Sequence, residues 1–344
     1  NTGVNNMRIG WVLEQLVKAG AAEDILFDAK PHVGTDVLLT VVQNIRQRII
    51  SLGGEVRFRS QVTGICTNNG VLTGVQLQNV ETIACKHAVF AIGHSARDTF
   101  CMLKAAGLEM EQKPFAMGVR IEHPQKLIDR IQYHGSCEAE YLPAASYSLV
   151  AQVGGRGVYS FCMCPGGFIV PAMTDESESV VNGMSPSRRN SPYANSGFVT
   201  EIRLSDFEHL VPQYGALAGL AFQRELEQAA RANARGAATA PAQRVSDFVA
   251  GRASGSLPAC SYVPGIVPSR LDEWMPSFMS SRLREAIRVF DKRMHGYLTS
   301  EAVVVGVESR TSTPVRVPRD KQSLMHPEVE GLFPAGEGAG YAGG

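Results

Sequence analysis

Apolar residues recur every three or four positions between residues 36 and 54, the spacing that places them on one face of a helix. The apolar members of this face are Leu38, Val41, Val42, Ile45, Ile49 and Leu52. Thr35 or Asp36 can cap the start of the helix, and Gly53-Gly54 supplies a left-handed stop. The pattern therefore predicts a helix over 36–54 with one apolar stripe.

Shorter apolar runs follow, and their length and β-branched content favour strands. The predicted strands of this part are 55–58, 62–67, 71–77, 82–85 and 87–93. Asn68-Asn69-Gly70 is a hairpin turn signal between two of them. The last strand ends in Gly93, and a helix is predicted after it at 96–106. Strands and helices in this mixture indicate an α/β fold.

The pattern changes after residue 113, where strand-like runs are no longer separated by helices. Strands are predicted at 116–122, 147–153, 157–162 and 168–172, and helices at 216–235, 242–250 and 279–294. Residues 174–197 are rich in Ser, Asn, Arg and Pro and predict a long loop. Two final strands are predicted at 306–317 and 331–335. We interpret the chain as one domain over 1–113, interrupted by a β-rich and then helical insert (an α+β unit) over 114–300, and resumed at 301–344.

The composition narrows the class of protein. The 344 residues include 33 Lys+Arg and 33 Asp+Glu, so the basic excess of a typical nucleic-acid binder is missing. No apolar run approaches the roughly 20 residues that a membrane helix needs. Seven cysteines scattered over a long chain indicate a reducing environment rather than a disulfide framework. We therefore predict a cytoplasmic protein with a small-molecule substrate and neither a nucleic acid nor a membrane as partner.

The end of the sequence is unusually rich in glycine. The apolar run 331–335 is followed by glycine at 336, 338, 340, 343 and 344, and residues 338–343 fit G-x-G-x-x-G. That pattern normally opens a Rossmann unit, but no βαβ unit of about 30 residues follows it here. Glycines also let the backbone approach a phosphate closely and offer free N–H groups to it. The turn is thus either a phosphate-binding turn or a glycine-rich surface tail.

Cys162 and Cys164 precede Pro165-Gly166-Gly167 in a strand-like run. Residues i and i+2 of a strand point the same way, and their Cα atoms lie about 6.6 Å apart, at the upper limit for a disulfide. The two cysteines are small apolar fillers, or they line a substrate pocket, or they are a redox thiol pair. No second cysteine or histidine pair has the spacing of a metal site, so we predict none.

Polar residues also cluster after the predicted strand at 306. Glu308, Arg310 and Thr311 lie within four positions, and Arg310 is suited to a substrate carboxylate. The alternative is a surface pair of Glu308 and Arg310, which contributes little. His123 follows another apolar run and is a candidate for proton transfer near neutral pH, although a lone histidine is more often structural.

Several segments together resemble one family, the bacterial NAD(FAD)-utilizing dehydrogenases, which are FAD-dependent and related to the glutathione-reductase-type flavoproteins. The segments that carry the resemblance are 29–36, 52–56, 118–124, 159–167, 181–185, 306–314 and the glycine turn at 336–344. They extend along essentially the whole chain and follow the family's order.

The resemblance implies an FAD/NAD(P)-binding Rossmann-like domain that is incomplete. Family members carry an N-terminal strand–turn–helix with the dinucleotide fingerprint and continue past the terminal glycines into a helix, so we expect that the chain is truncated at both ends. The positions that the resemblance places around FAD are Val62, Ala91, Gly93, Gly336, Glu337, Gly338 and Gly340.

The predicted function is that of an FAD-dependent dehydrogenase that transfers hydride through the flavin, with NAD(P)H as a co-substrate implied by the family name. We assign catalytic roles to Cys162, Cys164 and Arg310, and the lining of the substrate pocket to Gly166, Gly167, Glu308 and Thr311. Two alternatives stay open: a non-catalytic binding or scaffold unit without cofactor, and a thiol-redox enzyme that uses Cys162 and Cys164. The sequence leaves the substrate and the oligomeric state open.

Overall fold

The computed structural model describes residues 7–28, 31–135, 142–236 and 238–341. Its largest element is a seven-stranded mixed sheet in the order β13-β12-β14-β6-β11-β8-β7. The strands are β6 (Phe115–Pro124), β7 (Val150–Val153), β8 (Arg156–Cys164), β11 (Tyr193–Ile202), β12 (Ala240–Arg244), β13 (Ile266–Pro268) and β14 (Val303–Glu308). Only the edge pair β12–β13 is parallel within this sheet. The fold is therefore mixed α/β with one large mixed sheet.

Strand β6 lies at the centre of the sheet, and its sequence, FAMGVRIEHP, begins with a run of apolar residues and glycine from Phe115 to Val119. It pairs with β11 over its whole length and with β14 on its other side. Nine of its ten residues are buried, including the charged Arg120 and Glu122. A strand buried on both faces needs such a continuous apolar run.

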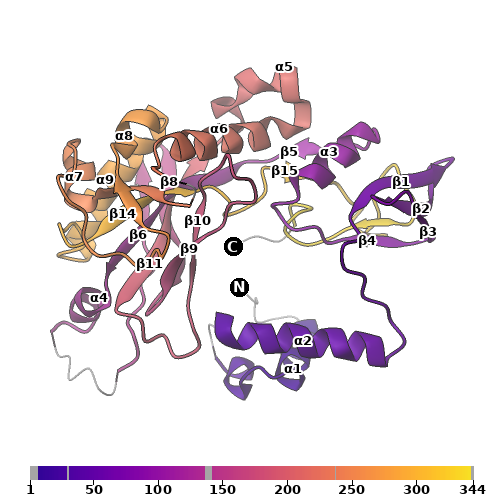
Figure 1. Ribbon diagram of the computed structural model, residues 1–344, viewed down its shortest axis with the longest axis horizontal. Coiled ribbons are helices and arrows are strands. Elements are labelled where there is room, and N and C mark those ends of the chain that lie inside the picture. Colours follow the sequence, from indigo (N-terminus) through magenta and orange to yellow (C-terminus); the bar gives the residue numbers. More distant parts are fainter. Residues whose placement is uncertain (1–6, 29–30, 136–141, 237, 342–344) are drawn as a thin grey trace.

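Helices pack against this sheet and form the main core with it (Figure 1). They are α4 (Gln125–Gln132), α5 (Val211–Tyr214), α6 (Ala218–Ala232), α7 (Val245–Ala250), α8 (Leu271–Trp274) and α9 (Ser277–Arg293). Short 3₁₀ helices lie at Glu23–Leu26, Leu204–Asp206, Glu208–Leu210 and Gly215–Leu217. The core side chains of α9 include Met279, Leu283, Ile287 and Phe290, which follow the spacing of three and four that the sequence predicts.

A hairpin of β9 (Phe168–Pro171) and β10 (Val181–Met184) crosses the large sheet. Strand β10 contacts β6, β8, β11 and β14. Gly183 makes this approach possible, because a Cβ atom there would lie 1.9 Å from Nη2 of Arg120. The hairpin thus covers buried polar residues of the sheet, such as Arg120.

A second, smaller part contains three more sheets and one helix (Figure 1). Its elements are β1 (Val62–Asn68), β2 (Val71–Leu77), β3 (Thr82–Ala84), β4 (Ala88–Phe90), β5 (Glu111–Gln112), β15 (Val315–Arg316), β16 (Leu332–Pro334) and α3 (Arg97–Ala105). Strands β1, β2 and β3 form an antiparallel sheet, and β16 pairs with β4 in parallel. The last strand of the described residues, β16, therefore pairs with a strand near residue 90.

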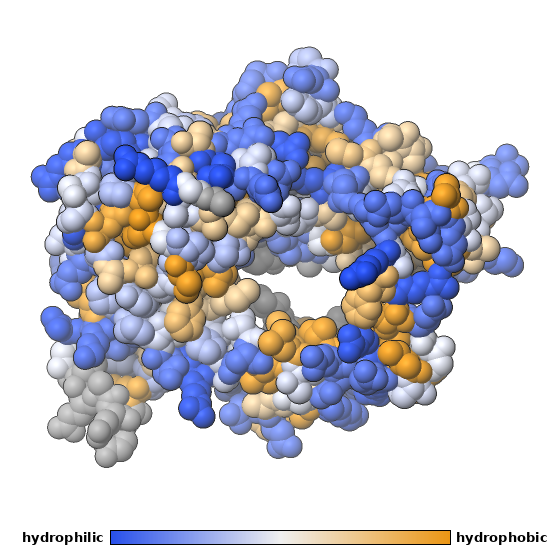
Figure 2. Space-filling model, viewed as in Figure 1, coloured by the Kyte–Doolittle hydropathy of each residue, from blue (hydrophilic) through white to orange (hydrophobic). Residues whose placement is uncertain are grey.

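Helices α1 (Met7–Lys18) and α2 (Thr35–Ser51) form a separate layer. Helix α2 bonds to the segment that follows β10: Asp36 accepts hydrogen bonds from the backbone and side chain of Ser187 at 2.8 and 2.7 Å, and the hydroxyl of Thr35 donates to the carbonyl of Ser185. Figure 2 shows an opening through the molecule between this layer and the rest, with apolar surface along its edge. Of the apolar stripe that the sequence gives α2, Val41 is buried, but Val42 and Leu52 are 57% and 78% exposed.

Several sequence predictions of secondary structure are wrong. Residues 55–58 are not a strand, and residues 174–197 are not one loop, because they contain β10 and the first half of β11. The predicted helix at 242–250 is a strand, β12, followed by the shorter α7. The predicted strand at 306–317 is broken between β14 and β15. The domain limits at 113/114 and 300/301 and the Rossmann-like character of the smaller part stay predictions.

Within the described ranges, no helix has the length and the apolar content that a membrane crossing would take.

Candidate functional site

The glycine turn predicted to bind a cofactor follows β16, at the edge where the parallel strands β4 and β16 both end. The backbone N–H of Ala335 bonds to the carbonyl of Phe90 at 3.0 Å, which keeps the two chain exits side by side. Ligands of α/β sheets bind outside the carboxyl ends of parallel strands. The predicted positions Ala91, Gly93, Gly336, Glu337 and Gly338 thus gather at one edge.

The glycines of this edge have different roles. A Cβ atom at Gly338 would lie 2.3 Å from the carbonyl oxygen of Gly93, so the two turns touch backbone to backbone. Gly340, at φ +81°, is close to the backbone of β15 in the same way. Gly93 and Gly336, at φ +70° and +72°, have nothing within 4 Å of a built Cβ atom. A side chain at either of these two glycines would therefore point into open space.

Several cations lie around the turn. The guanidinium of Arg319 lies 4.0 Å from the ring centre of Tyr341, and that of Arg316 lies 5.8 Å from the same ring. Burial and the charge of Arg316 lower the pKa of Lys113, while Glu337 opposes this effect. Glu337 also pairs with Nδ1 of His94 at 3.2 Å. Three basic side chains, Lys113, Arg316 and Arg319, therefore lie around the turn, together with the carboxylate of Glu337 and that of Glu111, which lies 3.6 Å from Arg316.

One predicted position differs from this group. Val62 begins β1, which belongs to another sheet than β4 and β16. Gly343 and Gly344 lie outside the described residues, as do Ala29 and Lys30 of the resembling segments.

A second cluster is built around Arg120 of β6, whose side chain is completely buried. Its Nε donates to Asn195 at 2.8 Å and its Nη1 to Glu308 at 3.2 Å. Its Nη2 donates to the carbonyl of Cys162 at 2.7 Å and to Sγ of Cys164 at 3.2 Å. A buried cation is costly unless such partners surround it. The structure thus brings together Cys162, Cys164 and Glu308, three of the predicted site residues.

Cys162 occupies an irregular point of β8. Cys164 pairs with Asn195 and Phe161 pairs with Gly197, so one extra residue is inserted between them. Cys162 has φ +45°, a left-handed conformation that is uncommon for residues other than glycine. As a whole residue Cys162 is exposed, whereas Cys164 is buried. A strained, exposed residue beside a buried charge is typical of functional sites.

The charges of this cluster influence each other. A hydrogen bond from Cys164 and the charge of Arg120 lower the pKa of Cys162 to about 6, although burial opposes them. The same hydrogen bond and burial raise the pKa of Cys164, which therefore keeps its proton. Burial raises the pKa of Glu308 to about 7, because it outweighs the attraction of Arg120.

His123 lies next to this cluster but is fully buried in an apolar site. Its Nε2 lies 2.8 Å from the carbonyl oxygen of Tyr297, and its ring packs on that of Tyr297 with centroids 4.4 Å apart. Burial lowers the pKa of His123 to about 4. The histidine is neutral at pH 7, so the hypothesis of proton transfer near neutral pH is wrong for this residue.

Gly166 and Gly167 adjoin the cysteine pair. Both are buried, and a Cβ atom would lie 1.8 Å from the carbonyl oxygen of Arg189 at Gly166 and 2.5 Å from that of Met184 at Gly167. They allow the segment after β10 to pack closely on the end of β8. Their predicted role in a substrate pocket stays a prediction.

Arg310 belongs to a different buried network. Its Nη2 bonds to Glu178 at 2.7 Å and to Glu227 at 3.2 Å, and its Nη1 bonds to Thr174 at 2.8 Å and Ser95 at 3.3 Å. Arg97 of α3 binds the same two carboxylates, at 2.6 and 2.8 Å. Arg310 is thus already neutralised by protein groups and joins α3, α6 and the segment before β10. Its predicted role toward a substrate carboxylate stays a prediction, as does that of Thr311, whose hydroxyl donates to the carbonyl of Ala116 at 2.7 Å.

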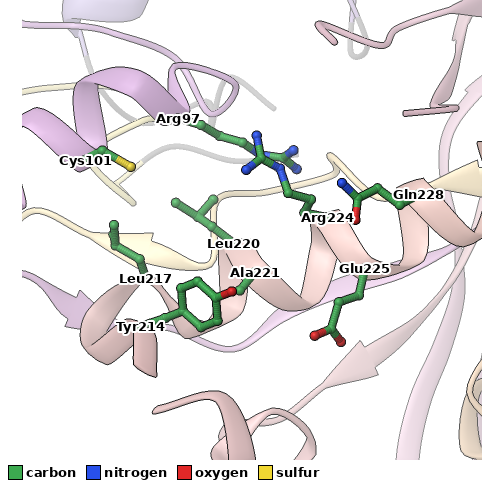
Figure 3. Close-up of a pocket in the computed structure, with 9 residues that line it drawn as sticks. All are labelled: Arg97, Cys101, Tyr214, Leu217, Leu220, Ala221, Arg224, Glu225 and Gln228. Carbon is green, nitrogen blue, oxygen red and sulfur yellow. The ribbon is translucent and has the colours of Figure 1, made fainter. Parts of the chain in front are cut away.

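A pocket of about 170 Å³ adjoins this network. Figure 3 shows the guanidinium groups of Arg97 and Arg224 side by side at its rim, with Leu217 and Leu220 on its wall. Arg97 begins α3 shortly after Gly93, so the pocket and the glycine edge belong to the same part of the fold.

Sequence reasoning missed Asn195, Glu178, Glu227 and Arg97, which hold these networks. A usable signal existed for Arg120, because it is the one charge in the apolar run Phe115–Ile121. The partners carried no such signal, since Asn195 and Glu178 lie in the polar stretch that predicts a loop.

No group of three or more His, Cys, Asp or Glu side chains that could hold a metal occurs among the residues that the structure describes.

Comparison with known proteins adds a relative and a solved structure. The chain is 44% identical over 347 residues to an uncharacterized protein of Clostridium beijerinckii, and the match covers all of this chain and 64% of that protein. The chain therefore spans about two thirds of the length of this curated relative. It also matches the crystal structure of CtdE in complex with FAD and a substrate at 11% identity and a TM-score of 0.28, over 87% of this chain and 49% of that one, a likeness too low to carry an argument.

A protein family also matches more than half of the chain. The model of the family described as FAD-dependent protein, C-terminal domain-like, matches residues 114–311, which include the Arg120 cluster and Arg310. FAD is the cofactor of this family, and it is the cofactor that the sequence predicts. The chain belongs to the FAD-dependent protein family with this C-terminal domain.

Proposed function

We propose that this protein is an FAD-dependent oxidoreductase whose glycine edge binds the phosphates of the cofactor. The observation that carries the proposal is the packing of two glycine turns, backbone to backbone, where the parallel strands β4 and β16 end. Such an edge is the usual place of a nucleotide cofactor in α/β folds. Bound FAD would supply the hydride acceptor or donor, which no side chain can provide.

The residues at this edge fit the pyrophosphate of FAD. Gly93 and Gly336 leave open a space that a Cβ atom at either position would enter. The cations Lys113, Arg316 and Arg319 favour an anionic group nearby. Glu337, held by His94, would face a hydroxyl or a backbone group rather than a phosphate.

The finer parts of the proposal have other support. Hydride transfer and NAD(P)H as electron donor rest on the resemblance to the NAD(FAD)-utilizing dehydrogenases. A small-molecule substrate beside Cys162–Gly167 and the Arg310 loop, and a cytoplasmic location, follow from the sequence pattern and the composition. The large sheet with its helices would then hold the substrate, and the smaller part the cofactor.

Flavin titration of a glycine variant tests the proposal. In Gly336→Asn, the backbone conformation is retained, because asparagine tolerates the left-handed region, but the side chain enters the open space. We expect FAD binding, followed by quenching of flavin fluorescence, to weaken at least about tenfold, or about 1.4 kcal/mol.

The matched control is Gly155→Asn, at φ +74° and equally unobstructed, in the turn between β7 and β8 of the other sheet. It should bind FAD as tightly as the unchanged protein. Equal affinities for the two variants, or no FAD binding by the unchanged protein, would contradict the proposed cofactor edge.

A further inference from the structure

The cysteine pair of β8 has the features of a chemical site that the proposed flavin chemistry does not use. Cys162 is an exposed residue with a strained backbone at φ +45°, and one residue separates it from a second cysteine, Cys164. Arg120, fully buried, holds both cysteines, since its Nη2 bonds to the carbonyl of Cys162 and to Sγ of Cys164. Structural cysteines are normally buried fillers, and Cys162 is not.

We propose that Cys162 and Cys164 form a reversible dithiol–disulfide pair that reacts with low-molecular-weight disulfides, with Cys162 as the attacking thiolate and Cys164 as the resolving thiol. This activity is separate from the proposed flavin function, because neither thiol needs FAD in order to react.

The geometry explains why Cys162 attacks first. It is the more exposed residue of the pair, so an incoming disulfide reaches Cys162 before Cys164. The charged groups around it are Arg120 of β6 and Glu308 of β14, and Arg120 favours the thiolate. The Cys164 thiol has one proton, which it donates to the carbonyl oxygen of Cys162 at 3.3 Å or to the Cys162 sulfur. The pKa of Cys162, lowered to about 6, agrees with this order.

The inserted residue also makes a bridge between the two sulfurs feasible. In a regular strand the Cα atoms of residues i and i+2 are about 6.6 Å apart, near the upper limit for a disulfide. The left-handed backbone at Cys162 and the inserted residue interrupt this regular spacing, and the Cys164 thiol lies 3.3 Å from the carbonyl oxygen of Cys162. Gly183 and Gly167 pack on Arg120 and Cys164, so the resolving thiol is held in place.

The reaction balances in two steps. The Cys162 thiolate attacks one sulfur of R–S–S–R, which forms the mixed disulfide Cys162–S–S–R and releases R–S⁻. The hydrogen bond that raises the pKa of Cys164 is then lost, while Arg120 remains 3.2 Å from its sulfur. Cys164 releases its proton to solvent and attacks the Cys162 sulfur, which forms the protein disulfide and a second R–S⁻. Two protein thiols are oxidised and one small disulfide is reduced.

Alkylation with iodoacetamide as a function of pH measures the first step. A thiol of pKa about 6 is half ionised at pH 6, whereas an unperturbed thiol of about 8.5 is ionised to roughly 0.3%. The lower intrinsic nucleophilicity of the more acidic thiolate removes about a factor of ten, so Cys162 should react roughly tenfold faster at pH 6. The exposed Cys101 of α3 is the internal comparison in the same peptide map.

Trapping with glutathione disulfide, without added FAD, tests the second step. The unchanged protein should give a peptide with a Cys162–Cys164 disulfide, and Cys164→Ser should instead accumulate glutathione on Cys162. Cys162→Ser should give neither product, and Cys101→Ser should behave like the unchanged protein. An alkylation midpoint at or above about 8.5, or Cys164→Ser protein that gains no glutathione on Cys162, would overturn the proposal. Because FAD is absent, these outcomes are independent of the flavin titration.

Discussion

The buried carboxyl group of Glu308 should make the protein lose stability as the pH rises through neutrality. Its side chain is 1% exposed and has Arg120 as partner at 3.2 Å, yet burial raises its pKa to about 7 from an ordinary value of 4.5. The folded protein therefore holds the proton more tightly than the unfolded chain does. The stabilisation is complete below pH 4.5 and is lost as the pH rises through about 7. Glu308→Gln keeps the shape of the side chain and removes this titration.

The size of the effect follows from the pKa difference. Each unit corresponds to about 1.4 kcal/mol, so the full shift amounts to roughly 3 kcal/mol. Between pH 5 and pH 8 the unfolded carboxyl is almost entirely ionised and the folded one becomes so only above 7. The free energy of unfolding of Glu308→Gln should therefore rise by about 2.5 kcal/mol relative to the unchanged protein over this interval.

Urea denaturation at several pH values between 5 and 8 gives the two stability curves. Their difference is the quantity of interest, because the titration of groups that are not coupled to Glu308 cancels in it. Glu225→Gln on the exposed face of α6 is the matched control, and its curve should run parallel to that of the unchanged protein. Parallel curves for Glu308→Gln as well would refute the reasoning, since Glu308 would then be ionised throughout in the folded state.

Two other substitutions test the buried polar groups. Arg310→Met should lower the free energy of unfolding by about 3–5 kcal/mol, because the buried carboxylates of Glu178 and Glu227, 1% and 0% exposed, lose one of their cations. Glu227→Gln in the same chain should recover part of this loss. A loss below about 1 kcal/mol in urea denaturation would contradict the network. His123 should stay neutral down to about pH 4 in an NMR titration. Between pH 6.5 and 4 the unfolded histidine gains a proton and the folded one does not, so the protein loses stability over this interval. His123→Gln should make this loss of stability smaller. A folded-state midpoint near 6.5 would show that the site is open to water.

The elements whose apolar residues recur at a regular spacing were predictable from the sequence. The helices α2, α6 and α9 and the hairpin β1–β2 lie where their apolar spacing and turn residues predict them. These elements depend mainly on local residue order. The buried stripe of α2 was only partly predictable, because burial depends on what the rest of the fold places against the helix, and Leu52 is exposed.

The stretch 174–197 was unpredictable for a physical reason. Its polar residues are typical of a loop, but Tyr193–Gly197 is the first half of β11, hydrogen-bonded on both sides. Asn195 is polar because it accepts from Arg120, and Ser196 because it bonds to the hydroxyl of Tyr147 at 2.9 Å. A buried polar network and a solvated loop have the same composition, so only the partners, far away in sequence, distinguish them.

Arg120 connects the stability prediction with the thiol site. It carries one positive charge and faces two groups that ionise near neutral pH, Cys162 at about 6 and Glu308 at about 7, and the negative charge of Cys162 is one cause of the high pKa of Glu308. When Cys162 enters a disulfide, that charge disappears, and the carboxylate of Glu308 becomes the remaining anion beside Arg120. The pKa of Glu308 should then fall, so the oxidised protein should lose less stability between pH 5 and 8 than the reduced one. Through Arg120, the redox state of the two thiols and the protonation of Glu308 thus depend on each other.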